Sequence, residues 1–308
     1  MSDELKRTAL HDRHVELGGR MVEFAGHSMP VLYETGPIEE HHITRRSVGI
    51  FDIDHMGQVA VTGPDAVAFL DHVVTSKIAD LEPGQSRYGL LLHEHGGVVD
   101  DVFVYRLADH YMVVINADNR DKDLDHLTKH AEPFDVSLDD RSDETYMLAV
   151  QGPRALELLN KLTDHNIFDI ERFAAAHVSL VDVPMVIGRT GYTGEDGVEL
   201  YFGDEHARRV WNALLDAGVE HDIETAPIGL AARDSLRFEP GFALYGHEIS
   251  DDINPLEARL AWAIDFDKDF VGKEALERIK AEGVERKLVT FVLLDKGVPR
   301  QGYPVLNA

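Results

Sequence analysis

The chain has 308 residues, of which 44% are hydrophobic and 8% aromatic, so it can build two or three domains with packed cores. Its 56 acidic residues outnumber its 30 basic ones, and the net charge of −26 argues against nucleic acid or an anionic membrane as a partner. The absence of cysteine excludes disulfides, thiolate nucleophiles, iron–sulfur ligation and cysteine zinc sites.

The sequence predicts a cytoplasmic protein. No stretch approaches the ~18 uninterrupted apolar residues of a membrane span, and the charged start lacks the apolar segment of a secretory signal. The acidic residues are spread along the chain. One hypothesis for this charge is adaptation to high salt, because salt screens the repulsion among the acidic side chains. The alternative is an acidic protein without such adaptation.

Two segments predict the same unit of a strand, a Gly-Pro turn and a helix. They are residues 61–70 and 150–159. Proline suits the first position of a helix, and the apolar residues that follow recur with helical spacing. Because Gly63 and Gly152 are 152 − 63 = 89 residues apart, two related α+β halves are predicted, with coincidence as the alternative.

The remaining elements are predicted from local patterns. Residues 98–107 and 111–116 have the composition of paired strands joined by a short turn. The later predictions, in chain order, are a strand at 178–187, a Gly-rich loop, a helix at about 206–217, a helix at 274–280 and a strand at 287–294. We expect the last strand to open a β-domain that the chain does not complete.

Two neighbouring carboxylates interrupt the predicted strand at 98–107. Successive side chains of a strand point to opposite faces, so Asp100 and Asp101 lie on different faces among apolar residues. The two predicted sets are Asp100 with Val98, Val102 and Val104, and Asp101 with Val99, Phe103 and Tyr105. Burying an ionised carboxylate without partners is very costly. Such an acid is therefore either paired structurally or held ready for a cationic group or an amine of a ligand.

Residues 189–200 form a second unusual segment. Three glycines, Gly191, Gly194 and Gly197, recur every third residue, which breaks helical and strand periodicity and lets the backbone approach a ligand. A cation, a phenol, hydroxyls and acids surround them. The segment predicts either a binding turn or an ordinary hairpin that joins 186–187 to 198–201.

A third candidate site is a pair of arginines. Arg233 and Arg237 lie four residues apart, on one face of a predicted helix, where they could hold a carboxylate or form a surface salt-bridge network. The histidine pairs at 41–42 and at 93 and 95 lack a third ligand nearby, so no metal site is predicted.

Taken in chain order, these segments resemble the aminomethyltransferase, or T-protein, family of the glycine cleavage system. Each motif is weak alone, but their order is specific. The matching segments are 21–26, 29–30, 49–52, 55–57, 96–101, Asn116, 151–153, 189–200, 232–237, 244–248 and 270–274.

The resemblance implies an α+β fold of three domains in a cloverleaf-like arrangement, with ferredoxin-like α/β units. The first domain, which binds folate, would comprise residues 1–52 and 141–245, and residues 53–140 would be inserted into it. Residues 246–308 would form a linker helix and the start of a C-terminal β-barrel or jelly-roll domain. Because family members extend further, that last domain is expected to be truncated.

The resemblance also implies the reaction. An aminomethyl group on the lipoyl arm of the glycine cleavage H-protein releases ammonia, and its carbon becomes 5,10-methylenetetrahydrofolate, with tetrahydrofolate as co-substrate and no metal. Asp101 would be the catalytic residue, whose carboxylate stabilises a cationic, iminium-like species. Glu199 would accept from the aminopyrimidine edge, and Arg233 would pair with the glutamyl carboxylate or orient a neighbouring acid. The positions that match folate contacts are Met56, Tyr88, Asn116, Tyr192, Glu199, Arg233 and Trp262.

Three departures from the family pattern leave the carbon donor open. His27 stands where tryptophan is usual, Asp54 where serine is usual, and Leu92-His93 where asparagine is common. One alternative is a tetrahydrofolate-dependent demethylase of a small methylamine or sulfonium compound on the same fold. Another is a noncatalytic folate-binding protein, although those relatives carry a cysteine motif that this chain lacks.

Overall fold

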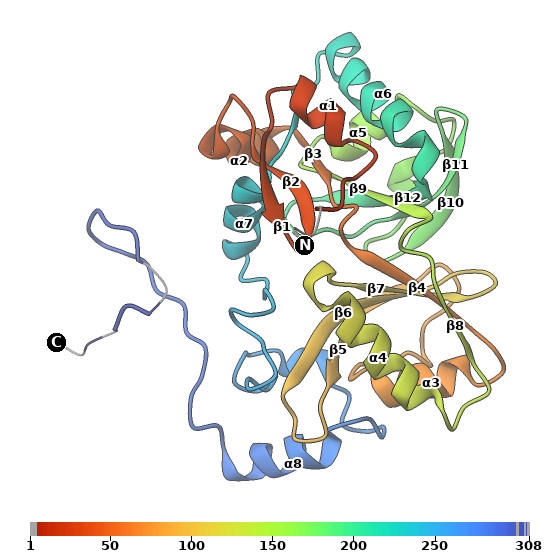
Figure 1. The fold of residues 1–308 in the computed structure, drawn as a ribbon, viewed down its shortest axis with the longest axis vertical. Helices are drawn as coiled ribbons and strands as arrows, with labels where there is room; N and C mark the ends of the chain where they lie inside the picture. Colours follow the sequence, from red (N-terminus) through yellow and green to blue (C-terminus); the bar gives the residue numbers. More distant parts are fainter. Residues whose placement is uncertain (1–4, 300–301, 305, 307–308) are drawn as a thin grey trace.

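Two large sheets and a separate hairpin organise the structure, a computed structural model that describes residues 5–299, 302–304 and 306 (Figure 1). The six-stranded sheet has the order β10 (Ala175–Leu180), β11 (Val183–Gly188), β12 (Gly197–Gly203), β9 (Thr145–Gln151), β3 (Val48–Asp52) and β13 (Thr225–Pro227). The five-stranded sheet has the order β5 (Ser86–Leu92), β6 (Val98–Arg106), β7 (Tyr111–Ile115), β4 (Gly57–Thr62) and β8 (Ser137–Asp140). The hairpin pairs β1 (Arg20–Phe24) with β2 (His27–Leu32).

Helices cover one face of each large sheet. α5 and α6 pack on the six-stranded sheet, and α3 and α4 pack on the five-stranded sheet. The α-helices are α1 (His11–Glu16), α2 (Pro37–Arg46), α3 (Ala66–Val73), α4 (Arg120–Ala131), α5 (Ala155–Leu159), α6 (Ala207–Glu220), α7 (Leu230–Phe238) and α8 (Lys273–Glu282). Short 3-10 helices occupy Ala117–Asn119, Ile167–Asp169, Asp204–His206 and Ala261–Ala263.

The other faces of the two sheets meet in a shared core. Along β9, Leu148 and Val150 point to α5 and α6, whereas Met147 and Ala149 join the cluster between the sheets, as the period of two in a strand requires. Tyr105 of β6 belongs to that same cluster. Residues of both sheets and of α7 therefore come together at the centre of the molecule.

The structure confirms several predicted elements. β6 and β7 pair as an antiparallel hairpin, and both strand–turn–helix units form, β4 with α3 in one sheet and β9 with α5 in the other. The helices begin two residues after each proline, at Ala66 and Ala155. A tight turn comes first, because the carbonyls of Gly63 and Gly152 accept bonds from the amides of these alanines.

The single strand predicted at 178–187 is wrong. This region is a hairpin of β10 and β11, whose residues pair from Ala175 with Gly188 to Leu180 with Val183. Val181 and Asp182 form its two-residue turn with φ of 46° and 58°. Such left-handed turns usually carry asparagine or glycine, so the sequence lacked the ordinary signal of a hairpin.

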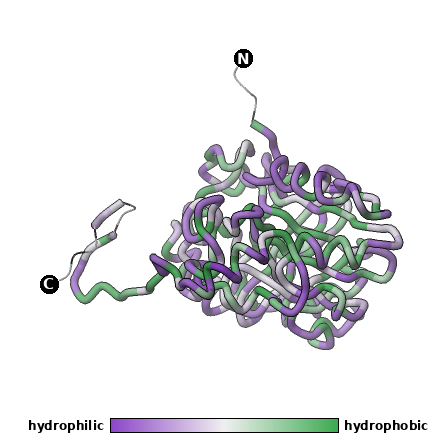
Figure 2. The backbone as a smooth tube through the Cα atoms, turned by 90° about the horizontal axis from the view of Figure 1, so that it is seen from below, coloured by the Kyte–Doolittle hydropathy of each residue, from purple (hydrophilic) through white to green (hydrophobic). Residues whose placement is uncertain are grey.

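The strand predicted at 287–294 is also wrong. Only the amide of Leu288 makes a backbone bond, to Glu257 at 2.9 Å, and no strand of the described residues pairs with this segment. Val292 and Leu294 are 86% and 97% exposed, and Figure 2 shows the segment running away from the main body. A strand needs a neighbour for its backbone groups. Residues 300, 301, 305, 307 and 308 of this predicted domain lie outside the described residues.

The fold is α+β, as predicted. The division into residues 1–52 with 141–245, 53–140 and 246–308 stays a prediction. In the part of the chain that the structure describes, no helix is long and apolar enough to span a membrane.

Candidate active site

Asp101 lies on the face of β6 that points to the other sheet, and Asp100 lies on the opposite face. Asp100 is fully buried, whereas Asp101 keeps some exposure. The prediction is wrong for Val98 and Val99. Val99 packs in the same cluster as Val102 and Val104, whereas Val98 packs in a different cluster with Leu90 and Leu92. The register between β5 and β6 shifts between Leu91 and Leu92, and this bulge breaks the alternation before Asp100.

Asn116 holds the Asp101 carboxylate. It follows β7 and donates from Nδ2 to Oδ1 of Asp101 at 2.8 Å. Burial raises the pKa of Asp101 to about 7, with a further rise from the charge of Asp100, while the bonds from Tyr88 and Asn116 oppose this rise. Asp101 therefore changes charge near neutral pH.

An aromatic stack extends from Asp101 to the surface. Tyr88 and Trp262 lie with ring centroids 5.2 Å apart and planes 25° apart. Trp262, from the 3-10 helix Ala261–Ala263, is 70% exposed. Because a large apolar ring is left uncovered beside a carboxylate, the stack suits the flat part of a ligand.

Arg233 and Tyr192 form a cation–π pair. The guanidinium of Arg233 lies 4.9 Å from the centroid of the Tyr192 ring, and the Tyr192 hydroxyl donates to the carbonyl of Ala243. Within the described residues, the Arg233 side chain has no ion pair or hydrogen bond. Its burial lowers its pKa. Arg233 is thus a half-buried cation available to an anionic ligand.

Arg237 has a different role from Arg233. It is buried and bonds Glu248 at 2.8 Å and Asp234 at 2.9 Å. It also donates to the carbonyl of Phe242 at 3.1 Å. Arg237 forms salt bridges as one interpretation of the pair predicted, but they are buried and not on the surface, and Arg233 forms none among the described residues.

Hydroxyl groups fix the Glu199 carboxylate. Its Oε2 accepts from Thr190 at 2.8 Å, from Tyr201 at 3.0 Å and from Tyr105 at 3.3 Å. Tyr105 and Thr190 are themselves 2.6 Å apart. Sequence reasoning missed Tyr105 and Tyr201, although both are aromatic residues of strands that carry a predicted site residue.

The loop at 189–196 is both a hairpin turn and a rigid support. It joins β11 to β12, whose strands pair at Gly188 and Glu199. Gln151, fully buried, donates to the carbonyls of Thr190 and Val198 at 3.1 Å and accepts from Thr193 at 2.9 Å. These bonds hold the backbone on both sides of Tyr192.

Met56 lies in the connection from β3 to β4 and packs against the core between the sheets. Its neighbour His55 is 5% exposed, and its Nδ1 has no partner among the described residues. Burial, and then the charge of Arg233, lower the pKa of His55 to about 3. The His55 imidazole, next to Met56, is therefore neutral at physiological pH.

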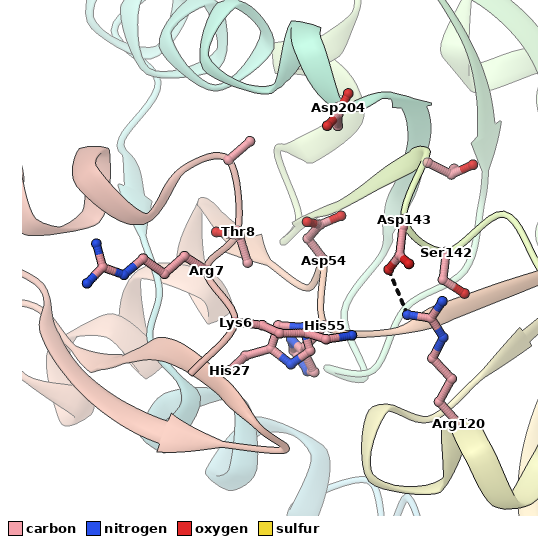
Figure 3. Close-up of a pocket in the computed structure, with 12 residues that line it drawn as sticks. Lys6, Arg7, Thr8, His27, Asp54, His55, Arg120, Ser142, Asp143 and Asp204 are labelled. Atoms are coloured by element: carbon pink, nitrogen blue, oxygen red, sulfur yellow. Dashed lines mark hydrogen bonds and ion pairs between the residues drawn. The ribbon is translucent and has the colours of Figure 1, made fainter. Parts of the chain in front are cut away.

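A cavity of about 350 Å³ opens on the other side of His55 (Figure 3). His27, Asp54 and the ion pair of Arg120 with Asp143 contribute to its lining. Burial raises the pKa of Asp54 to about 9, helped by the charge of Asp52. None of the predicted site residues lines this cavity. Among the described residues, no group of three or more His, Asp or Glu side chains could hold a metal ion.

The chain resembles known proteins along most of its length. The profile of the family described as the GCVT N-terminal domain matches residues 10–268. An aminomethyltransferase of Herpetosiphon aurantiacus is 48% identical over 98% of this chain and 82% of its own length. An aminomethyltransferase of Chloroherpeton thalassium is 45% identical over 98% of this chain and 83% of its own length. The crystal structure of the glycine cleavage system aminomethyltransferase T from Bartonella henselae superposes with a TM-score of 0.84 at 36% identity, covering 91% of this chain and 76% of that one.

Proposed function

Because this chain belongs to the aminomethyltransferase family, the T proteins of the glycine cleavage system, we propose that Asp101 is the catalytic residue of its aminomethyl transfer to tetrahydrofolate. The family uses tetrahydrofolate as its one-carbon acceptor and its members are enzymes of glycine breakdown. The observation that carries the proposal is the position of Asp101. Its carboxylate accepts from Asn116 on the face of β6 that points to the other sheet. The structure also offers an exposed aromatic stack and a cation that forms no salt bridge among the described residues.

The residues present fit tetrahydrofolate. Glu199 offers a carboxylate that can accept from an aminopyrimidine, and its three hydroxyl donors keep it in one orientation. Arg233 suits the carboxylate of the glutamyl part, because no acid among the described residues forms a salt bridge with it. Tyr88 and Trp262 supply a flat apolar surface. Met56, packed against the same core, completes the apolar lining.

Asp101 would act through its charge. Positive charge develops at nitrogen when a one-carbon unit leaves an amine, and a fixed anion in a water-poor site stabilises that charge. Asn116 orients the carboxylate before the reaction, so little reorganisation is needed. The same carboxylate, with a pKa of about 7, can also hold a proton close to the reacting nitrogen.

The carbon donor is proposed to be the aminomethyl-lipoyl arm of the glycine cleavage H-protein. Family membership supports this donor over a small methylamine or sulfonium compound. The test supplies the chain with tetrahydrofolate and either aminomethyl-loaded H-protein or free methylated amines. It measures ammonia and 5,10-methylenetetrahydrofolate from the carrier, and 5-methyltetrahydrofolate from the amines, because a methyl group is transferred without oxidation. Turnover of the loaded carrier alone is expected. Turnover of a free methylated amine alone would replace this proposal by the demethylase alternative.

A further inference from the structure

Three histidines come together where α3 and α4 lie side by side on the five-stranded sheet (Figure 1). His126 and His130 are four residues apart on α4, and their ring centroids lie 4.6 Å apart with the planes 49° apart. The ring centroid of His72, on α3, lies 5.5 Å from that of His130. All three side chains are partly buried, so the cluster reaches the surface.

These three imidazoles lack the partners that other histidines of the chain have. His93 and His95 lie 2.7 Å and 2.9 Å from acceptor oxygens of Asp251. In the part of the chain that the structure describes, no hydrogen bond or ion pair holds the three clustered rings, and Nε2 of His126 is buried without a partner. A buried nitrogen without a partner costs free energy. A ligand bound by this nitrogen would recover that cost.

The sequence spacing and the ring geometry suit a metal ion. Two histidines four residues apart lie on one face of a helix and can chelate one ion. A ligating nitrogen lies about 2.1 Å from the ion and the ring centroid about 1.1 Å further, so two imidazoles at a right angle have centroids about 4.5 Å apart. A tetrahedral angle would separate the centroids by about 5.2 Å. The observed 4.6 Å matches the right angle of a tetragonal or octahedral site, which suits Ni²⁺ and Cu²⁺.

Water would complete the coordination of such an ion. No group of three or more His, Asp or Glu side chains among the described residues could hold a metal, so the chelate has two protein nitrogens and leaves its other positions to solvent. His72, which itself packs on Phe134 with ring centroids 5.6 Å apart, limits the rotation of the His130 ring. Hard ions such as Mg²⁺ prefer oxygen ligands, whereas this cluster offers nitrogen.

We propose that His126 and His130 form a binding site for a divalent transition-metal ion, with Ni²⁺ and Cu²⁺ as the ions that fit its angle. The site lies with α4 on the face of the sheet opposite Asp101, so it goes beyond the proposed function and does not depend on it. An ion that joins two turns of α4 should stabilise the folded chain, because the unfolded chain does not hold the two rings together.

Calorimetric titration of the untagged chain with nickel chloride tests the site, at about pH 8, where imidazoles are neutral. Binding of one ion per chain is expected. His126→Gln and His130→Gln should each weaken the Ni²⁺ affinity by about tenfold or more, because the chelate loses one of its two nitrogens. Tm should rise with nickel chloride in the parent chain and not in these variants.

A matched control removes a different pair of neighbouring histidines. His41 and His42 are adjacent on α2, with ring centroids 5.6 Å apart. The double variant His41→Gln with His42→Gln should keep the Ni²⁺ affinity of the parent. Titration with magnesium chloride should give the same result for the parent and for both α4 variants, because imidazole is a poor ligand for Mg²⁺.

Cu²⁺ provides a readout that needs no variant. The electron paramagnetic resonance spectrum of the parent chain, with less than one equivalent of Cu²⁺, should show splitting from two equatorial imidazole nitrogens. A spectrum with oxygen ligands only would overturn the proposal, even if an α4 variant did not fold. Equal Ni²⁺ affinities of the parent, His126→Gln and His130→Gln would also overturn it and would indicate an adventitious ion only. Neither readout uses substrate, so an inactive parent that binds Ni²⁺ as expected would count against the proposed function alone.

Discussion

At the scale of single residues, the charge of Asp101 sets the expected pH dependence. Its pKa is raised to about 7, so the carboxyl is neutral below that pH and cannot stabilise positive charge. We expect kcat/KM to fall as the pH drops through about 7. Asn116→Leu removes a donor that opposes the rise and should move this limb upward. A limb near pH 4, the value of an ordinary carboxyl, would contradict the account.

The two arginines of α7 should respond differently to substitution. Arg233→Leu removes a cation that forms no ion pair or hydrogen bond among the described residues, so tetrahydrofolate affinity should fall by about 1.5–3 kcal/mol with little change in stability. Arg237→Leu leaves the Glu248 carboxylate without its main partner and should cost about 3–5 kcal/mol of unfolding free energy. Ligand titration and denaturant unfolding of both variants check this. Equal losses of stability would show that Arg233 is structural.

The sequence predicted the types of the site residues better than their partners. Asp101, Tyr88 and Asn116 were expected near folate, and the bond from Asn116 to Asp101 agrees with one site, although their roles stay predictions. The bond from Tyr105 to Glu199 could not be predicted, because it joins a strand of one sheet to a strand of the other. No spacing rule connects residues so far apart in the chain.

At the scale of elements, the hairpin of β11 and β12 needs glycine at position 191. A Cβ there would lie 1.9 Å from Oε1 of Gln151, the residue that ties the loop to the sheet. We expect Gly191→Ala to destabilise the protein by about 1–3 kcal/mol through overpacking and to weaken tetrahydrofolate binding by moving Tyr192. Gly297→Ala, where a Cβ would meet open space, is the matched control. Unchanged thermal stability and affinity in Gly191→Ala would refute this role.

Local patterns predicted most helices and strands but failed where the pairing of strands determines the structure. The hairpin of β10 and β11 was predicted as one strand, because Val181 and Asp182 adopt left-handed backbone angles without an asparagine or glycine. The bulge beside Leu91 displaced Val99 from its predicted face. The apolar run at 287–294 has strand composition, yet a strand exists only with a neighbour. These outcomes depend on contacts that are distant in sequence.

At the scale of the whole molecule, the net charge of −26 predicts a response to salt. Repulsion among 56 acidic residues exceeds what 30 basic residues can offset, and about 1 M salt shortens the Debye length to about 3 Å. We expect Tm to rise between about 0.05 and 1 M potassium chloride. A Tm that stays constant or falls over this range would contradict the hypothesis of adaptation to high salt.

The most direct test of the central claim compares the parent chain with Asp101→Asn, using aminomethyl-loaded H-protein and tetrahydrofolate. The variant keeps the size of the side chain and removes its negative charge. We predict that kcat falls by about 100-fold or more, as when electrostatic stabilisation is lost, while the Kd for tetrahydrofolate stays nearly unchanged. A variant with the kcat of the parent would contradict the claim that the Asp101 carboxylate stabilises the charge formed during transfer.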